Sequence, residues 1–312
     1  MMNADEDRTS KVVDTGEGAV ITVGTFDGIH IGHQTVLDCV VKDAKRKFLK
    51  GIVLTFQTHP LQVLRPSEAP RLLTTLEEKV SLLTRFGIDG VEIIPFTPEF
   101  SRLSPVAFVR DYLSKKFQMV ELVIGYDHGF GHGRQGSVAV LRSIADELGF
   151  QLVVVDPVKV DSQAVSSSRI REAIGRGDLD YTGRALGRPY SFLGRVVRGD
   201  GRGRDIGFPT ANLALSGHDK LLPPDGVYAV QVELKGEAYA GMLHQGKRPP
   251  FERAARSIEV HLIDFEGDIL NESLEVGYLK WIRPIERFVG PDELRAQLEK
   301  DREYARSTVR LR

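Results

Sequence analysis

The fold of the first half of the chain is determined by one stretch, Ala19-Val20-Ile21-Thr22-Val23-Gly24-Thr25-Phe26-Asp27-Gly28-Ile29-His30-Ile31-Gly32-His33. Residues 19–23 are mostly apolar and predict a short buried strand, and a helical pattern begins near Gln34. Glycines at such a turn let backbone N–H groups approach phosphate oxygens, and the start of the helix adds the positive end of its dipole. The stretch therefore predicts a nucleotide-binding turn between a strand and a helix.

Four further apolar runs follow this stretch and alternate with helical patterns. The apolar runs are 51–56, 91–94, 121–124 and 151–155, and the amphipathic stretches are 76–86, 105–117 and 138–148. Strands that are apolar on both faces and alternate with helices indicate a parallel sheet covered by helices on each side. We expect an α/β, Rossmann-like domain over residues 1–184.

The pattern changes in the second half of the chain. Glycine and proline cluster at 199–209 and 223–226, and the apolar runs 227–234 and 258–262 alternate with polar residues. Such strands expose one face and suit a small antiparallel β-barrel. A C-terminal amphipathic helix is expected from Pro291 to about Ser307, with Leu294, Leu298 and Tyr304 on one side. We place the join between Asp178 and Arg188 and the second domain at 185–312.

Composition limits the classes of function and partner. The 312 residues exceed the usual size of one hydrophobic core, so two domains are expected. The net charge of -1 gives no attraction toward polyanions, so neither nucleic acid nor membrane is expected as a partner. The one cysteine, Cys39, cannot form an internal disulfide. We therefore expect a cytoplasmic protein that is a monomer or a weak homo-oligomer.

Polar side chains follow the ends of the predicted strands in the first half. His30 and His33 lie three residues apart at the start of a helix, so they face the same way and can donate hydrogen bonds to phosphate oxygens. Residues 165–171 open another helix with hydroxyls and cations suited to phosphate. Segments 56–60 and 125–131 follow two other strand ends, where open α/β sheets bind ligands. Taken singly, these features are also typical of tight turns and helix caps.

In combination, these pieces resemble a known family. The string His-x-Gly-His at 30–33, directly after the first strand, is similar to the signature of the nucleotidyltransferase superfamily. Segments 24–33, 56–60, 73–79, 125–131 and 165–171, in this order, resemble the N-terminal domain of bacterial bifunctional riboflavin kinase/FAD synthetases. The resemblance implies a nucleotidyltransferase domain over 1–184 that adenylylates FMN to FAD with ATP and releases pyrophosphate.

The resemblance also implies roles for individual residues in this domain. His30 and His33 are the catalytic candidates. Contacts with ATP and flavin are implied for Gly24, Phe26, Asp27, Gly32, Phe56, His59, Asp127, Phe130, Ser167, Ser168 and Arg171. FMN already presents a phosphate anion as the nucleophile, so this transfer needs alignment and charge stabilisation by Mg²⁺, histidines and backbone amides, and no base.

The second half contains a more specific string, Gly207-Phe208-Pro209-Thr210-Ala211-Asn212, which resembles the signature of riboflavin kinases. The resemblance implies a riboflavin kinase domain in which Thr210 and Asn212 bind Mg²⁺ and, together with Gly207 and Pro209, the phosphates of ATP. Riboflavin offers a hydroxyl as its nucleophile, so this transfer gains from a general base. The matching carboxylate is Glu259, in a strand where it would otherwise be an ordinary solvated glutamate.

Other interpretations stay open. The family usually has Ile-Gly-x-Arg-Pro-Thr-Phe where residues 244–251 of this chain have Pro250 in place of the threonine, so the chain could be an FAD synthetase with a weakened kinase domain. The first domain could serve phosphopantetheine or nicotinamide mononucleotide, although such enzymes lack the second string. Imidazoles at 30, 33, 128 and 132 could hold zinc, but the glycine turn would then have no role. A flavin sensor without activity is disfavoured by the intact Thr210, Asn212 and Glu259.

Overall fold

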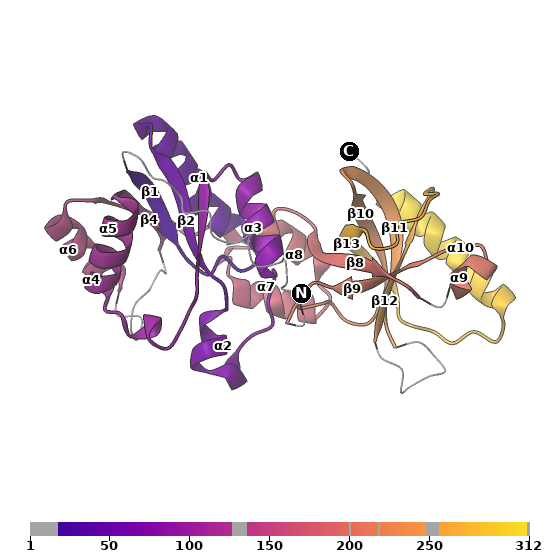
Figure 1. Ribbon diagram of the computed structural model, residues 1–312. Coiled ribbons are helices and arrows are strands. Elements are labelled where there is room, and N and C mark those ends of the chain that lie inside the picture. Colours follow the sequence, from indigo (N-terminus) through magenta and orange to yellow (C-terminus); the bar gives the residue numbers. More distant parts are fainter. Residues whose placement is uncertain (1–17, 127–135, 200, 218, 248–255, 311–312) are drawn as a thin grey trace, which may run out of the picture. The chain divides into compact units, whose positions relative to one another are not determined.

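The computed structural model describes residues 18–126, 136–199, 201–217, 219–247 and 256–310. The chain divides into two compact units, the first ending at Ser167 and the second beginning at Ser168 (Figure 1). The predicted boundary after Arg184 falls further along, inside a helix of the second unit, and stays a prediction about where the two activities separate.

A sheet of five parallel strands forms the centre of the first unit, in the order β3-β2-β1-β4-β5. The strands are β1 (Ala19–Val23), β2 (Lys50–Phe56), β3 (Gly90–Ile94), β4 (Met119–Gly125) and β5 (Gln151–Val155). From β1 the chain proceeds to β2 and β3 on one side and later to β4 and β5 on the other. The carboxyl end of β1 is therefore the switch point at which open sheets bind ligands. The predicted parallel sheet is confirmed.

Helices cover both faces of this sheet (Figure 1). On one face α1 (Ile31–Lys47) and α3 (Leu76–Arg85) bury Leu37 and Leu83 against Val20 and Val53. On the other face Phe108 and Leu141 pack against Ile21 and Leu122. The elements there are α4 (Pro105–Ala107), the π-helix η3 (Phe108–Ser114), α5 (Lys115–Phe117) and α6 (Val138–Leu148). The expected helix over 105–117 is thus present with a π-helical middle.

Short elements join these larger ones. They are α2 (Pro60–Leu64), two 3-10 turns, η1 (Pro66–Glu68) and η2 (Phe100–Arg102), and a small hairpin of β6 (Lys159–Val160) and β7 (Gln163–Ala164). Two helices follow, α7 (Ser167–Gly175) and α8 (Leu179–Leu186). Within the second unit, Asp180 of α8 forms an ion pair of 2.7 Å with Lys280 of the barrel. Helix α8 is therefore attached to the barrel.

The second unit is a closed, six-stranded antiparallel barrel, in the order β10-β11-β12-β9-β8-β13. Its elements are β8 (Tyr190–Val197), α9 (Arg202–Asp205), β9 (Ala211–Leu215), β10 (Gly226–Leu234), β11 (Glu237–Gly246), β12 (Ser257–Leu262), β13 (Ser273–Arg283) and α10 (Pro291–Thr308). The predicted barrel and its C-terminal helix are confirmed.

Side chains of the barrel alternate between its interior and the face that α10 covers. Tyr228 and Tyr278 are fully buried and meet edge to face, with ring centroids 5.2 Å apart, which is the packing expected inside a small barrel. Ala229 and Met242 have the opposite orientation and share a core cluster with Ala305 of α10. This outer face under α10 is where the second site forms.

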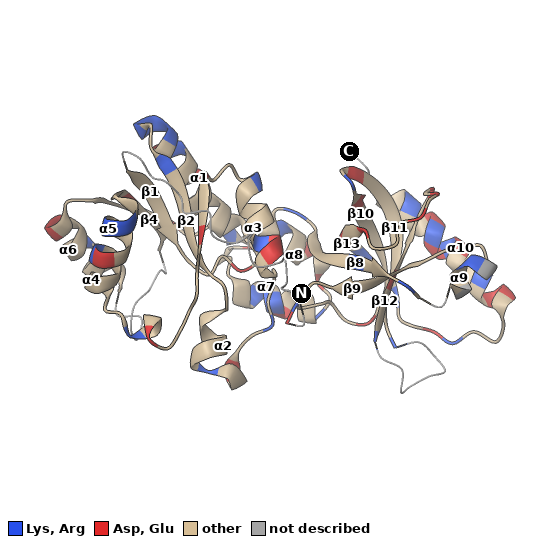
Figure 2. Cartoon of the chain, viewed as in Figure 1, with Lys and Arg blue, Asp and Glu red and all other residues tan. Residues whose placement is uncertain are grey.

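The helix α10 differs from its prediction in which residues face the barrel. Tyr304 is 45% exposed, so the expectation that it shares the side of Leu294 and Leu298 is wrong. Asp301 and Ala305 occupy the buried face, and charges of both signs cover the rest of the helix (Figure 2). Asp301 is accommodated there because it accepts hydrogen bonds of 3.0 and 2.8 Å from Arg283 at the end of β13.

Candidate active sites

The turn after β1 has a backbone that few side chains adopt. Phe26, Gly28 and Ile29 have φ of 47°, 83° and 40°, in the left-handed region. A Cβ on Gly24 would lie 3.1 Å from the ring of Phe26, and one on Gly32 would lie 3.2 Å from the ring of His30. Both glycines are therefore required by close approach within the turn, and Phe26 is a buried anchor.

Asp27 fixes this turn to a distant segment. Its carboxylate accepts hydrogen bonds from the backbone N–H groups of Leu73 and Thr74 at 3.0 and 2.9 Å, and its side chain is only 3% exposed. The Thr74 hydroxyl also accepts from the N–H of Gly28 at 3.1 Å. Ser167 donates to the carbonyl of Asp27 at 2.9 Å. Two of the predicted ATP residues, Asp27 and Ser167, thus brace the turn from behind.

The two histidines stack on one another at the start of α1. Their ring centroids are 3.7 Å apart, and His30 caps the helix by accepting from the N–H of His33 at 3.3 Å. Burial, with the neighbouring charges of His30 and Lys79, lowers the pKa of His33 well below its usual value. Among the described residues, Nδ1 of His33 has no hydrogen-bond partner. His33 is therefore neutral near pH 7.

Phe56 and His59 lie at and just beyond the end of β2. The ring of Phe56 contacts those of Phe96 and Phe100, with centroids 5.2 and 6.2 Å away. His59 caps α2 by accepting from the N–H of Leu61 at 3.2 Å. Phe56 therefore belongs to an aromatic group beside the strand end, whereas one ring nitrogen of His59 is engaged in capping.

For several predicted residues, the structure gives no position relative to the turn after β1. Asp127 and Phe130 lie outside the described residues, as do the histidines at 128 and 132 of the zinc alternative. Ser168 and Arg171 lie on α7 in the second unit, so their approach to the turn stays a prediction.

Lys79 also belongs to this site, although no role for it was predicted from the sequence. Its ammonium group donates to the carbonyl of Thr25 at 3.2 Å and to that of Phe56 at 2.9 Å, and the residue is 8% exposed. Burial lowers its pKa to about 8. In the sequence, the available signal was its position three and four residues before Leu82 and Leu83, on the apolar face of α3.

The second site is built on one row of residues across the barrel. Strand register pairs Asn212 with Glu259, and Glu259 with His244. The row continues from His244 to Val227 and from Val227 to Arg283. Residues directly opposite each other in antiparallel strands point to the same face with Cβ atoms about 5 Å apart. The row therefore crosses five strands, and within it the predicted base, Glu259, lies directly opposite the predicted metal ligand Asn212.

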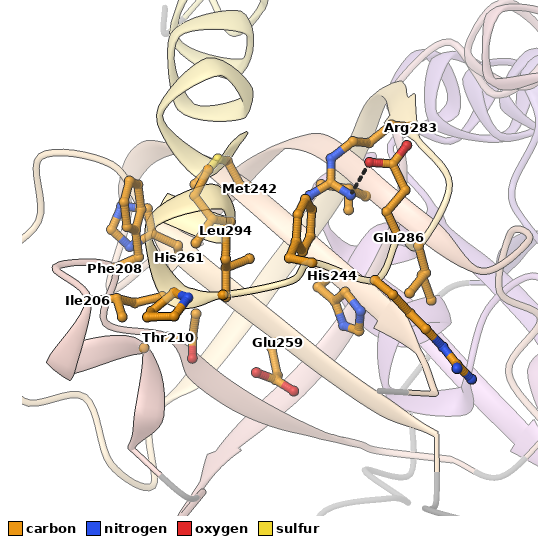
Figure 3. A pocket seen from close by; sticks show the side chains of 18 residues that line it. Ile206, Phe208, Thr210, Met242, His244, Glu259, His261, Arg283, Glu286 and Leu294 are labelled. Atoms are coloured by element: carbon orange, nitrogen blue, oxygen red, sulfur yellow. Dashed lines mark ion pairs between the residues drawn. The ribbon is translucent and has the colours of Figure 1, made fainter. Parts of the chain in front are cut away.

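The row opens into a pocket of about 580 Å³ between the barrel and α10 (Figure 3). Glu259 and His244 point into it, and Phe208, Met242 and Leu294 give it apolar walls. Glu259 is 5% exposed and accepts a hydrogen bond of 2.9 Å from the hydroxyl of Ser257. The volume and the mixture of apolar walls with a few polar groups are typical of a small-molecule site. His244 is a second residue for which no role was predicted.

The loop that precedes residues 207–212 comes close to the two predicted metal ligands. A Cβ on Gly199 would lie 1.9 Å from Nδ2 of Asn212, and one on Gly203 would lie 3.4 Å from the hydroxyl of Thr210. Gly207 has φ of 83°, in the left-handed region. The ring of His261 lies 2.8 Å, through Nδ1, from the carbonyl of Pro209, which can only accept, so Nδ1 is the donor. A neutral oxygen from each ligand suits a hard cation that keeps most of its waters.

Both halves of the chain match known families. Residues 13–169 match the family described as FAD synthetase, and residues 186–309 match the family described as riboflavin kinase. The bifunctional riboflavin kinase/FMN adenylyltransferase of Listeria monocytogenes is 39% identical over 92% of this chain and 91% of its own. The chain belongs to this family. Members from Haemophilus influenzae and Bacillus subtilis are 37% and 36% identical over similar spans.

A solved structure is similar over the same span. The crystal structure of a macrolide-efflux protein from Streptococcus pneumoniae has a TM-score of 0.84 and is 34% identical, covering 94% of this chain and 95% of that one. The two chains therefore share both units of the fold. In the described part of this family member, no helix is long and apolar enough to cross a membrane.

Proposed function

We propose that this family member makes FAD from riboflavin with two molecules of ATP, phosphorylating riboflavin in residues 185–312 and adenylylating FMN in residues 1–184. The two family matches support the pair of activities. The observation that best supports the residue assignment is the row Asn212, Glu259, His244, in which a buried carboxylate that lines a pocket lies opposite the proposed metal ligand.

In the kinase step, Glu259 is the general base. It takes the proton from the riboflavin hydroxyl as that oxygen forms a bond to the γ-phosphorus of ATP, and the bond to the β-phosphate oxygen breaks to release ADP. The hydrogen bond from Ser257 orients the carboxylate for this task. The apolar walls at Phe208, Met242 and Leu294 suit the flavin ring. A positioned base of this kind contributes roughly 10²- to 10⁴-fold.

Thr210 and Asn212 would hold Mg²⁺ beside the ATP phosphates. The fit is supported by Gly199, where a Cβ would lie 1.9 Å from Nδ2 of Asn212 and crowd this ligand. At Gly203 a Cβ would lie 2.2 Å from the carbonyl of Phe208, two residues before Thr210. When bound, the ion neutralises charge on the transferred phosphoryl group. Gly207 and Pro209 give the string the shape that presents Thr210, and His261 holds Pro209 in place.

In the adenylyl step, the phosphate of FMN is already an anion and needs no base. Its oxygen forms a bond to the α-phosphorus of ATP, and the bond to the β-phosphate breaks to release pyrophosphate. His30 and His33 donate to phosphate oxygens as charge builds, and the backbone N–H groups of the turn do the same. Asp27 and Ser167 hold that turn rather than touch the nucleotide. The expected phosphate contacts of Ser168 and Arg171 remain predictions from the family resemblance.

The setting of the enzyme follows from the same residues. We propose a cytoplasmic monomer or weak homo-oligomer whose partners are riboflavin, FMN and ATP, without nucleic acid or membrane. Cys39 is compatible with a reducing compartment, because burial raises the pKa of its thiol to about 11 and it is a free cysteine.

The direct test is to incubate the purified chain with riboflavin, ATP and Mg²⁺ and to follow all products. ADP and FMN should form first, and pyrophosphate and FAD should follow. Formation of pyrophosphate from added FMN without any ADP from riboflavin would support an FAD synthetase with a weakened kinase domain. If no pyrophosphate forms from FMN and ATP, the adenylyl assignment is wrong.

A further inference from the structure

Lys79 is a buried cation that neither catalytic step yet uses. It belongs to α3 and is 8% exposed, and two of its three N–H groups donate to backbone carbonyls of two different strand ends. One carbonyl is that of Thr25, in the turn after β1, and the other is that of Phe56, the last residue of β2. Thr55 also donates to the Thr25 carbonyl, at 3.2 Å. The amine therefore ties the phosphate-binding turn to the end of the neighbouring strand.

We propose that Lys79 is a positioning residue of the adenylyl-transfer site, whose ammonium group holds the turn at Thr25 against the end of β2 and places a fixed positive charge behind the nucleotide phosphates. This inference rests on the proposed adenylyl function. The ring of Phe56 packs against Phe96 and Phe100. By bonding to the carbonyls of both Phe56 and Thr25, Lys79 therefore also fixes this aromatic group relative to the turn.

The retained charge argues against a purely structural tie. Burying an ammonium group is costly, and two carbonyls could be bridged by a neutral amide at lower cost. The cost is partly offset by Asp27, whose charge favours the protonated amine, although burial has the larger effect and lowers the pKa of Lys79 to about 8. A charge kept under these conditions, at a strand end where phosphates bind, is typical of a functional site.

The cation also acts on the catalytic histidines. Of the charged and titratable groups around it, Asp27 lies in the turn and Glu78 on its own helix. His30 caps α1, and His33 lies in its first turn. Lys79 and His30 both lower the pKa of His33, after burial as the main cause. Removing the charge of Lys79 should therefore raise the pKa of His33, whereas a substitution that keeps the positive charge should leave it low.

Three variants test the proposal: Lys79→Met, Lys79→Arg and, as a control, Lys42→Met on the exposed side of α1. Lys79→Met should lower kcat/KM for ATP in FAD formation by about 10- to 100-fold, the range for losing one preorganised electrostatic group. FMN formation by the second unit should stay within about twofold, and the control should change neither activity. Lys79→Arg, which keeps the cation, should retain more of the FAD activity than Lys79→Met.

A proton NMR titration of His33, assigned with a His33→Gln variant, gives a readout that needs no turnover. The pKa of His33 should rise in Lys79→Met and remain low in Lys79→Arg. An unchanged pKa of His33 in a folded Lys79→Met protein would overturn the proposal even if the adenylyl function holds. Failure of the wild-type enzyme to release pyrophosphate would instead refute the proposed function and leave this titration to decide the placement of the charge.

The wild-type pH profile covers the case in which Lys79→Met does not fold. Because kcat/KM reports groups of the free enzyme, kcat/KM for ATP in FAD formation should fall as the pH rises through about 8, where Lys79 loses its proton. Lys79→Arg should not show this fall, since a guanidinium stays charged. A wild-type profile without the inflection, or one that Lys79→Arg leaves unchanged, would contradict the proposal.

Discussion

Glu259 and His33 show how differently two residues of one chain prepare a phosphate transfer. Glu259 is a buried carboxylate that accepts a hydrogen bond from Ser257, and in its proposed role it takes a proton from a neutral hydroxyl. His33 is kept neutral by burial and by the cations beside it, and it has a proton to donate to a phosphate. In these proposed roles, Glu259 activates the riboflavin hydroxyl as a nucleophile, and His33 stabilises negative charge on the phosphates.

A substitution at Gly199 tests whether Asn212 is a metal ligand. Gly199→Ala places a Cβ 1.9 Å from Nδ2 of Asn212, so the amide must move away from its position beside Thr210. We expect the Mg²⁺ concentration for half-maximal FMN formation to rise about tenfold or more, with FAD formation from FMN unchanged. Gly183→Ala in α8, where the nearest atom would be 3.9 Å from the new Cβ, is the matched control. An unchanged Mg²⁺ dependence in Gly199→Ala would exclude Asn212 as a ligand.

His261 gives a prediction about pH. Burial lowers its pKa, while its hydrogen bond to Pro209 raises it less. The unfolded chain then binds the proton more tightly than the fold does, so stability is complete above about pH 6.5 and falls as the pH drops below it. Urea unfolding of the barrel at pH 7 and pH 5.5 should show this loss, and His261→Gln should reduce it. A loss of equal size in both proteins would show that another group is responsible.

At the scale of elements, β12 and α10 build the second site together. Strand β12 lies between β9 and β11, so its Glu259 reaches both Asn212 and His244. Helix α10 closes the pocket with Leu294 and Leu298, and its buried Asp301 is tied to Arg283 at the end of β13. A buried ion pair therefore helps to hold the helix on the barrel, together with the packing of Leu298 and Ala305.

Breaking that pair should loosen the helix. Asp301→Ala removes the buried carboxylate that pairs with Arg283 and leaves the guanidinium, which is 12% exposed, only the more distant Glu286 at 3.8 Å. Losing one member of a buried pair costs about 3 to 5 kcal/mol. Chemical denaturation of the second unit measures the loss, and the KM for riboflavin should rise with it. Arg306→Ala removes an exposed pair with Asp264 and should cost less than about 1 kcal/mol. Equal losses in the two variants would contradict this account.

The elements also show what the sequence could predict. Apolar runs located all five parallel strands, and alternation located β10 and β12, because burial on two faces or on one leaves a visible pattern. The partners of Asp27 and Asp301 could not be predicted, since Leu73 and Arg283 are distant in sequence and meet only in the fold. For the same reason, the sequence motifs predicted Glu259 and Asn212 but did not show that the two are neighbours. His244 was identified from the strand register, and Lys79 from its buried contacts on α3.

On the scale of the whole molecule, the two activities should be separable, and α8 decides where. Helix α8 lies against β8 and β13, and its Asp180 pairs with Lys280, so we expect α8 to add to the stability of the barrel. Fragments 1–184 and 185–312 should carry FAD formation and FMN formation respectively. A longer fragment, 168–312, keeps α8 and should unfold at a higher temperature than 185–312. If either fragment alone catalyses both steps, the assignment of activities to the two halves is wrong.

If one chain holds two independent ATP sites of different chemistry, a reciprocal pair of variants should inactivate the two sites one at a time. Glu259→Gln should lose at least about 100-fold in ADP release from riboflavin while pyrophosphate release from added FMN stays at the wild-type rate. A combined His30→Ala and His33→Ala variant should show the reverse, and mixing the two proteins should restore FAD formation from riboflavin. Loss of both activities in either folded variant, or no recovery on mixing, would contradict the claim.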